Sequence, residues 1–290
     1  MKNSVHALLA QSLQLKASTD LEMTEAFGGD ICQSYLAQIT GGPTVFVKAG
    51  DPSFQNMFAM EQKGLNALAQ CTELTVPTPQ HVNQNSEVAI LVMNALDFGP
   101  KTDKGQRHLG RGLAQMHQIT HTRFGFEADN FIGKTPQKNQ WHDNWVEFWL
   151  QCRMHPQLDL LAFRGASSTF LTVADSFCAQ LPSLLSGHSP KPSLLHGDLW
   201  SGNFGILNDH TPCIFDPAVY YGDRETDLAM TRLFGGFSKS FYEGYQEVLP
   251  QAPGHEERQA IYNLYHILNH ANLFGGGYFM QAQTEMQRFL

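Results

Sequence analysis

The sequence predicts an α+β protein with two lobes: a small β-rich lobe over residues 1–96 and a larger, mostly helical lobe over residues 97–290. Three observations support this division. Short apolar segments separated by glycine turns dominate the first third of the chain, which is typical of antiparallel strands. From about Lys104 onward, apolar residues recur every three or four positions, which is typical of helices. A glycine-marked loop over residues 196–203 lies between two short apolar runs of the second lobe.

The elements of both lobes follow from these patterns. In the first lobe, leucines at helical spacing open the chain, and a turn rich in glycine joins two strands into a hairpin. The elements expected there are helices at 3–17 and 54–68 and strands at 27–39, 45–48, 81–83 and 88–93. The helices expected in the second lobe lie around 109–116, 145–152, 170–181, 225–233, 239–248 and 256–273.

A lysine and a glutamate of the first lobe are expected to pair. Alternation along the second strand places Phe46 and Lys48 on one face, and Glu61 falls on the apolar stripe of the following helix. A carboxylate on an inward face is costly unless it is paired, and Lys48 is the natural partner. A lysine that binds ATP phosphates and is held by such a glutamate is the arrangement of kinases. The alternative is that Glu61 borders the stripe and lies in water.

The loop at 196–203 carries the most specific pattern. Asp198 is followed by Asn203 five positions later and by Asp216 thirteen positions after that. This is the spacing of a kinase catalytic loop and its magnesium ligands. A hydroxyl nucleophile needs a carboxylate to orient it and accept its proton, and Mg²⁺ prefers oxygen ligands. Taken alone, His-Gly-Asp could be an ordinary turn whose aspartate caps backbone N–H groups.

The segment between the lobes is the second place where a nucleotide is expected to bind. Met93, Asn94 and Ala95 are predicted to form the hinge, where backbone groups could bind an adenine edge. No G-x-x-x-x-G-K-[ST] pattern occurs in the sequence, which excludes a Walker-type phosphate loop.

Composition excludes several other classes of function. The net charge of −8 argues against nucleic acid or an anionic membrane as the main partner, while local groups can still bind ATP. Five cysteines without close spacing indicate neither a disulfide framework nor a zinc site. The longest apolar run, 88–93, is too short to span a membrane, and no signal peptide is expected. A cytoplasmic enzyme is therefore the default expectation.

With these residues in view, the chain resembles the fructosamine kinase (ketosamine-3-kinase) family, relatives of aminoglycoside phosphotransferases and choline kinases within the protein-kinase-like fold. The resemblance covers nearly the whole chain, from about Phe27 to Phe274. Trp200 after His-Gly-Asp and the later Asp-Pro-Ala with its Tyr-Gly single out this family. The segments that carry the resemblance are 194–203 and 215–230, supported by 46–48, 91–93, 129–133, 135–137, 234–237 and 264–270.

The resemblance implies an activity and a set of roles. The γ-phosphate of ATP would pass to the 3-hydroxyl of a ketoamine sugar on an amine or a protein lysine, and decomposition of the product would free the amine. The resemblance implies that Asp198 is the base and that Asn203 and Asp216 are the Mg²⁺ ligands. It also implies that Lys48 and Glu61 form the phosphate-binding pair and that Gly28 and Gly29 cover the nucleotide. Asn94 departs from the glutamate that relatives commonly carry at the hinge.

Three further residues have both a functional and a structural interpretation. Trp200 could offer a flat apolar face to the sugar, or it could pack beneath the loop as core. Asp227 is expected to start a helix and to hold the His196 loop by accepting backbone N–H bonds. Cys32 lies where relatives often carry a redox-active cysteine, but a passive thiol is an equal alternative.

Two other function classes remain open from the sequence. One is a kinase of another small hydroxylated amine, of aminoglycoside or choline type. The other is a kinase-like binding module without turnover, against which the complete set of Lys48, Glu61, Asp198, Asn203 and Asp216 argues. The sequence does not distinguish fructosamine from ribulosamine or free from protein-bound adducts, and it leaves the oligomeric state open.

Overall fold

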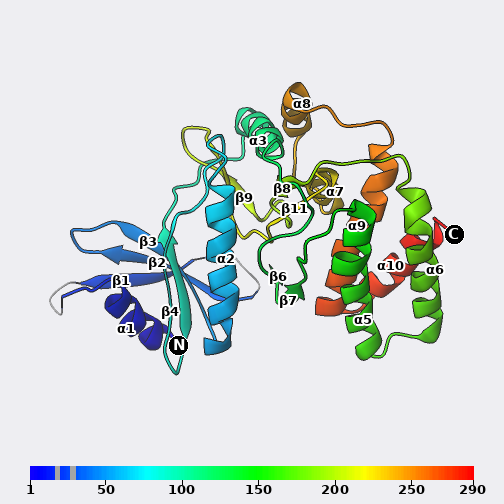
Figure 1. Ribbon diagram of the computed structural model, residues 1–290. Helices are drawn as coiled ribbons and strands as arrows, with labels where there is room; N and C mark the ends of the chain where they lie inside the picture. The colour runs from blue at the N-terminus through cyan, green and yellow to red at the C-terminus, as the bar shows by residue number, and fades with distance from the viewer. Residues whose placement is uncertain (17–19, 27–30) are drawn as a thin grey trace.

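The structure is a computed structural model that describes residues 1–16, 20–26 and 31–290 (Figure 1). A β-sheet dominates the N-terminal part, and most helices gather in the C-terminal part, as the sequence predicts. The pair Gly28-Gly29, expected to cover a nucleotide, lies outside the described residues.

A five-stranded antiparallel sheet forms the N-terminal part, with strand order β1-β2-β3-β5-β4. The predicted hairpin is present, since Tyr35 of β2 lies opposite Val47 of β3. The strands are β1 (Leu21–Ala26), β2 (Gln33–Ile39), β3 (Thr44–Gly50), β4 (Pro79–Gln84) and β5 (Ala89–Asn94).

One helix covers each face of this sheet. Helix α1 (Lys2–Ser12) packs on the face that carries Val45 and Val47. Helix α2 (Gln55–Leu68), which follows the short 3₁₀ turn η1 (Pro52–Phe54), packs on the opposite face. The alternation predicted for β3 is therefore confirmed, and it directs Lys48 towards α2.

The C-terminal part is mostly helical, and its largest hydrophobic core lies among these helices. Its helices are α3 (Asp103–Met116), α4 (Trp145–Trp149), the π-helical turn η2 (Leu150–Met154), α5 (His155–Phe163), α6 (Ser168–Leu184), α7 (Glu225–Leu233), α8 (Lys239–Val248), α9 (His255–Phe274) and α10 (Gly277–Gln287). None of the helices among the described residues is long and apolar enough to cross a lipid bilayer.

Three small antiparallel strand pairs bring separate parts of this region together. Strand β8 (Ser193–Leu195) pairs with β11 (Tyr220–Gly222), and β9 (Phe204–Ile206) pairs with β10 (Pro212–Ile214). The third is formed by β6 (Asn130–Ile132) and β7 (Thr135–Gln137). Because Phe204 at the start of β9 lies opposite Ile214 at the end of β10, the loop before β9 adjoins the segment after β10, which brings Asp198 and Asp216 into one region.

Most predicted elements agree with the structure, and a few elements of the structure were not predicted. The helices predicted at 225–233 and 239–248 match α7 and α8 to the residue. Strand β1 was not predicted, because it is an edge strand with a single fully buried side chain, Met23. Helices α5 and α10 were also not predicted. The predicted lobe boundary after residue 96 stays a prediction; it falls between the end of β5 and the start of α3.

Candidate active site

The loop between β8 and β9 begins with a turn that only glycine can form. Gly197 has φ = +83°, and a Cβ atom at this position would lie 2.0 Å from the carbonyl oxygen of Ala218. Any other residue would meet both a strained backbone and a steric clash. Glycine in the His-Gly-Asp motif therefore lets the loop lie against the segment that follows Asp216.

The buried side of this loop is held by one carboxylate, Asp227 in the first turn of α7. Its two oxygens accept hydrogen bonds from the backbone N–H groups of His196 (2.8 Å) and Gly197 (2.9 Å). His117 Nε2 lies 3.1 Å from Asp227 Oδ2. Burial alone would raise the pKa of Asp227, but the hydrogen bonds and His117 lower it overall, so the carboxylate stays charged. The predicted structural role of Asp227 is confirmed.

The ring of His196 ties the loop to the strand that leads to Asp216. His196 Nε2 lies 2.9 Å from the carbonyl oxygen of Phe215, so this nitrogen carries the proton. His196 Nδ1 then accepts the backbone N–H of Asp198 at 3.3 Å. Burial lowers the pKa of His196, which fits a neutral imidazole with this structural role.

On the other side of the loop, Asp198 and Asn203 face a cavity. Asn203 Nδ2 donates to the backbone oxygen of Asp198 at 2.9 Å and lies 3.5 Å from Asp198 Oδ2. Burial, followed by repulsion from Asp216 and Asp227, raises the pKa of Asp198 to about 7. A carboxyl group with a pKa near neutrality is suited to accept a proton from a bound hydroxyl.

Lys48, Glu61 and Asp216 form one cluster, in which Lys48 is buried and the two carboxylates are partly exposed. Lys48 Nζ lies 2.6 Å from Glu61 Oε1, and it also binds Asp216 Oδ1. Burial alone would lower the pKa of Lys48, but Asp216 and Glu61 outweigh it and hold that pKa well above the usual value. Burial raises the pKa of Glu61 to about 7, against the pull of Lys48. The ion pair expected from the sequence is thus present.

The backbone at Asp216 is unusual. Asp216 has φ = +57°, a left-handed conformation that aspartate tolerates better than most residues. Its side chain is 32% exposed, towards the same cavity that Asp198 faces. This conformation brings the carboxylate within reach of Lys48.

The cavity has a volume of about 640 Å³ and lies between α2, the loop and the C-terminal helices. The six candidate residues that line it are Lys48, Glu61, Asp198, Trp200, Asn203 and Asp216. Trp200 is 38% exposed, and its ring lies so close to Gly202 that a Cβ there would be 2.3 Å from it. The interpretation of Trp200 as core is therefore wrong.

The predicted hinge lies outside this cavity. Met93 and Asn94 are the last residues of β5, and neither they nor Ala95 line it. The side chain of Asn94 accepts the backbone N–H of Thr78 at 2.6 Å, and the Ala95 N–H points to Thr44 O at 3.4 Å. Adenine binding at this segment stays a prediction.

Cys32 lines the cavity and is half-buried. Burial is the main cause that raises its pKa to about 11. Because the thiolate is the reactive form, the structure favours the passive interpretation of this cysteine.

Some cavity residues were not assigned a role from the sequence. Four of them form an aromatic group at the end formed by α7, α9 and α10, namely Phe234, His270, Phe274 and Tyr278. Asn269 of α9 also lines the cavity. The signal available for Asn269 was its spacing from Asn263 and His266, which places three polar residues on one side of the second half of α9, where all three are buried.

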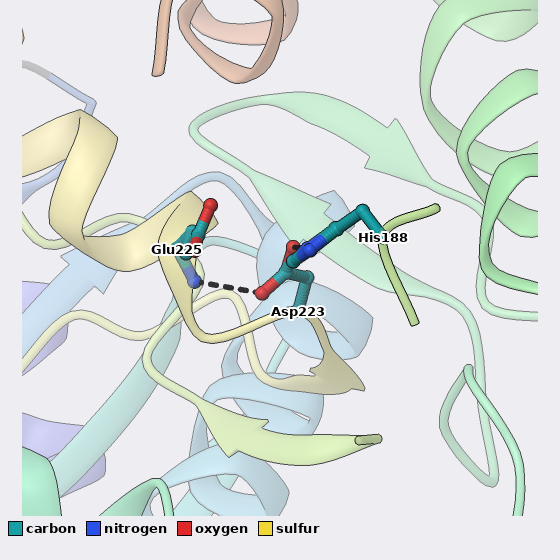
Figure 2. Close-up of side chains that lie close together, drawn as sticks. All are labelled: His188, Asp223 and Glu225. Carbon is teal, nitrogen blue, oxygen red and sulfur yellow. Dashed lines mark hydrogen bonds and ion pairs between the residues drawn. The ribbon is translucent and has the colours of Figure 1, made fainter. Parts of the chain in front are cut away.

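A second cluster of possible metal ligands is fully engaged in the fold. His188, Asp223 and Glu225 lie together at the start of α7, with their ligand atoms within 4.8 Å of one another (Figure 2). His188 Nε2 is 2.5 Å from Asp223 Oδ2, and Tyr262 donates to the same oxygen at 2.6 Å. Arg258 binds both oxygens of Glu225, at 2.7 and 2.9 Å. This cluster anchors the helix that carries Asp227.

The sheet, the helical part and the cavity between them define a protein-kinase-like phosphotransferase. Comparison identifies the family: the model of the fructosamine kinase family matches residues 1–290, and the chain belongs to this family. The chain is 44% identical over 271 residues to a Vibrio parahaemolyticus protein named "Probable ketoamine kinase", covering 93% of this chain and 92% of that protein.

Two further relatives agree with this assignment. The chain is 38% identical over 276 residues to the chloroplastic protein-ribulosamine 3-kinase of Arabidopsis thaliana, covering 94% of this chain and 84% of the relative. A crystal structure of a fructosamine-3-kinase homologue from Haemophilus somnus superposes with a TM-score of 0.87 at 28% identity, covering 100% and 98% of the two chains.

Proposed function

We propose that this protein transfers the γ-phosphate of ATP to the 3-hydroxyl of ketoamine sugars, fructosamine or ribulosamine adducts, carried by small amines or by protein lysines. The observation that carries the proposal is the convergence of Lys48, Asp198, Asn203 and Asp216 on one cavity in a chain of the fructosamine kinase family. The phosphorylated adduct then decomposes and releases the amine, so the reaction serves deglycation.

In the proposed reaction, Asp198 orients the 3-hydroxyl and accepts its proton. The hydroxyl oxygen forms a bond to the γ-phosphorus as the bond from that phosphorus to the β,γ-bridging oxygen breaks, and ADP leaves with the electron pair. Asn203 keeps Asp198 in place through its hydrogen bond to the Asp198 backbone oxygen.

Lys48 is proposed to bind the nucleotide phosphates, with Glu61 as its anchor. A lysine held by a glutamate of the neighbouring helix presents a fixed positive charge to the phosphate oxygens. Its contact with Asp216 would then be exchanged for phosphate, while the pair with Glu61 persists. The raised pKa of Lys48 keeps this charge at every physiological pH.

The residues around Asp216 fit a magnesium ion. Two carboxylates, Glu61 and Asp216, share one ammonium group, so the cluster has room for a further positive charge. None of the described residues donates a hydrogen bond to Asn203 Oδ1. Asn203 and Asp216 would hold the ion, which supplies charge neutralisation at the phosphates.

The cytoplasm is the proposed compartment. All five cysteines are free in the structure, and four of them are buried, which is typical of proteins from a reducing environment.

A substrate panel tests the proposal. ATP consumption is measured with fructosyl-lysine, ribulosyl-lysine, choline and an aminoglycoside as acceptors, each with Mg²⁺ and with EDTA. We expect turnover with one or both ketoamines that requires Mg²⁺. Turnover with choline or the aminoglycoside, and none with the ketoamines, would reject the proposed acceptor.

A further inference from the structure

A second cavity, of about 510 Å³, lies on the other side of α2 from the candidate active site. Met60 and Glu61 of α2 line the active-site cavity, whereas Lys63 and Asn66 line the second cavity. Among the described residues, the two cavities share none. Helix α2 stands between the sheet and the helical part (Figure 1) and thus contributes one face to each cavity.

One wall of this second cavity is a group of aromatic rings from three separate segments. The ring of His121 stacks on Trp141 with centroids 4.3 Å apart and planes at 24°, and it lies 5.1 Å from the ring of Tyr221. The guanidinium of Arg123 lies 5.5 Å from the Trp141 ring. His121 is exposed and the other two rings are half-buried, so the three rings form a partly exposed aromatic wall in which His121 stacks on Trp141.

The opposite wall, from α2 and the residues after it, is polar. Asn66 is exposed, and no described residue hydrogen-bonds its side-chain amide. Lys63 Nζ of α2 lies 3.0 Å from Glu127 Oε1, and this ion pair links α2 to the helical part beside the cavity. Gln70, which follows α2, also lines the cavity, so this wall carries amide and charged groups.

We propose that this cavity is a second ligand site, which binds a monosaccharide ring. A sugar ring has C–H faces that pack on flat aromatic surfaces and a rim of hydroxyls that need hydrogen-bond partners. The cavity offers the stacked rings of His121, Trp141 and Tyr221 on one wall and amide and charged groups on the other. A purely apolar ligand would remove water from Asn66 and from the Lys63–Glu127 pair and would offer no hydrogen bonds in place of that water. The volume accommodates such a ring, in the range typical of small-molecule sites.

A sugar in this site would contact α2 on the face opposite Glu61. Such a ligand would contact both α2 and the helical part, so we expect its binding to slow amide exchange along α2.

The test uses saturation-transfer NMR on the full chain without nucleotide, with D-glucose and D-ribose as probes. The site variants are Trp141→Ala and Asn66→Leu, and the control variant is Phe163→Ala, an exposed aromatic side chain that lines neither cavity. Trp200→Ala reports separately whether a probe binds in the active-site cavity. The surface position of Asn66 keeps that variant informative if Trp141→Ala does not fold. Amide hydrogen exchange along α2 is the second readout.

We expect saturable binding of at least one probe, weakened roughly tenfold or more by Trp141→Ala and by Asn66→Leu and unchanged by Phe163→Ala. The bound probe should slow amide exchange in α2. Absence of saturable binding, or binding that is lost in Trp200→Ala and kept in both site variants, would overturn the proposal. Neither result depends on turnover, so the proposed function is tested separately.

Discussion

The two sides of the loop at 196–203 differ in how their polar groups are satisfied. On the buried side, the backbone N–H groups of His196 and Gly197 bind Asp227, the His196 carbonyl accepts the N–H of Ala218, and the His196 ring binds Phe215. On the cavity side, the nearest described donor to the Asp198 carboxylate is the Asn203 amide at 3.5 Å.

This difference separates two tasks within a few residues of chain. A buried polar group without a partner costs free energy, so the satisfied side holds the loop in one conformation. The cavity side leaves groups available for ligands, at a cost in stability that the buried side offsets. We therefore expect substitutions on the cavity side to change turnover and substitutions on the buried side to change stability.

The largest expected effect on turnover comes from the proposed metal ligands. Asp216→Ala should abolish Mg²⁺-dependent phosphorylation, because it removes the one carboxylate of the proposed ligand pair. Asn203→Ala should lower turnover and raise the Mg²⁺ concentration that is required. Initial rates over a Mg²⁺ titration check both, with Asp209→Ala, an exposed aspartate in the β9–β10 turn, as the matched control. Wild-type Mg²⁺ dependence in Asp216→Ala would place the ligands elsewhere.

Lys48→Ala should reduce kcat/KM for ATP by roughly 10²–10³-fold, the usual effect of losing one charged group that stabilises the transition state. The KM for the ketoamine should change much less. Steady-state kinetics with each substrate varied in turn separates the two. If the KM values for ATP and for the ketoamine rise together, Lys48 supports the shape of the whole cavity and does not act specifically on nucleotide binding.

On the buried side, Asp227→Asn should destabilise the protein by about 3 kcal/mol, because an amide cannot accept both backbone N–H bonds and also face His117. Since the pKa of Asp227 is lowered in the folded state, its contribution to the free energy of unfolding is fully present above a pH of about 4. That contribution is lost as the pH falls through the folded-state pKa. The stability difference between wild type and variant should therefore shrink in acid. Urea unfolding of wild type and variant at pH 7 and below pH 4 measures this stability difference. An equal difference at the two pH values would contradict the stabilising role assigned to the charged Asp227.

The smallest expected effect is at Trp200. Trp200→Ala should raise the KM for the ketoamine up to roughly tenfold and leave the KM for ATP nearly unchanged, because the ring offers a face to the sugar only. Thermal stability should change little, since the side chain is exposed to the cavity. A large fall in Tm would show that the ring supports the loop through its contact with Gly202.

The sequence was sufficient for the parts of the site that follow local rules. The alternation of β3 and the helical period of α2 predicted the Lys48–Glu61 pair, since both rules fix the direction of a side chain within one element. The hydrogen bonds from the His196 loop to Asp227 were also predicted, because a carboxylate in the first turn of a helix is a natural acceptor of backbone N–H groups.

Features that depend on distant packing could not be predicted in this way. The contact of Lys48 with Asp216 joins β3 to the segment after β10, and the left-handed backbone of Asp216 has no sequence signal that separates it from an ordinary aspartate. The aromatic wall of His121, Trp141 and Tyr221 is built from three loops and strands far apart in the chain. Edge strand β1 was not predicted, because only Met23 of its side chains is fully buried.

The most direct test of the account is Asp198→Asn, measured for turnover, ATP binding and thermal unfolding in one preparation, with Asp209→Asn as control. If the cavity side performs the chemistry and the buried side holds the loop, kcat for the ketoamine falls on the order of 10²–10⁴-fold. ATP affinity and Tm stay near those of the wild type. A folded Asp198→Asn protein with near wild-type turnover, or one that loses activity only because it unfolds, would contradict the account.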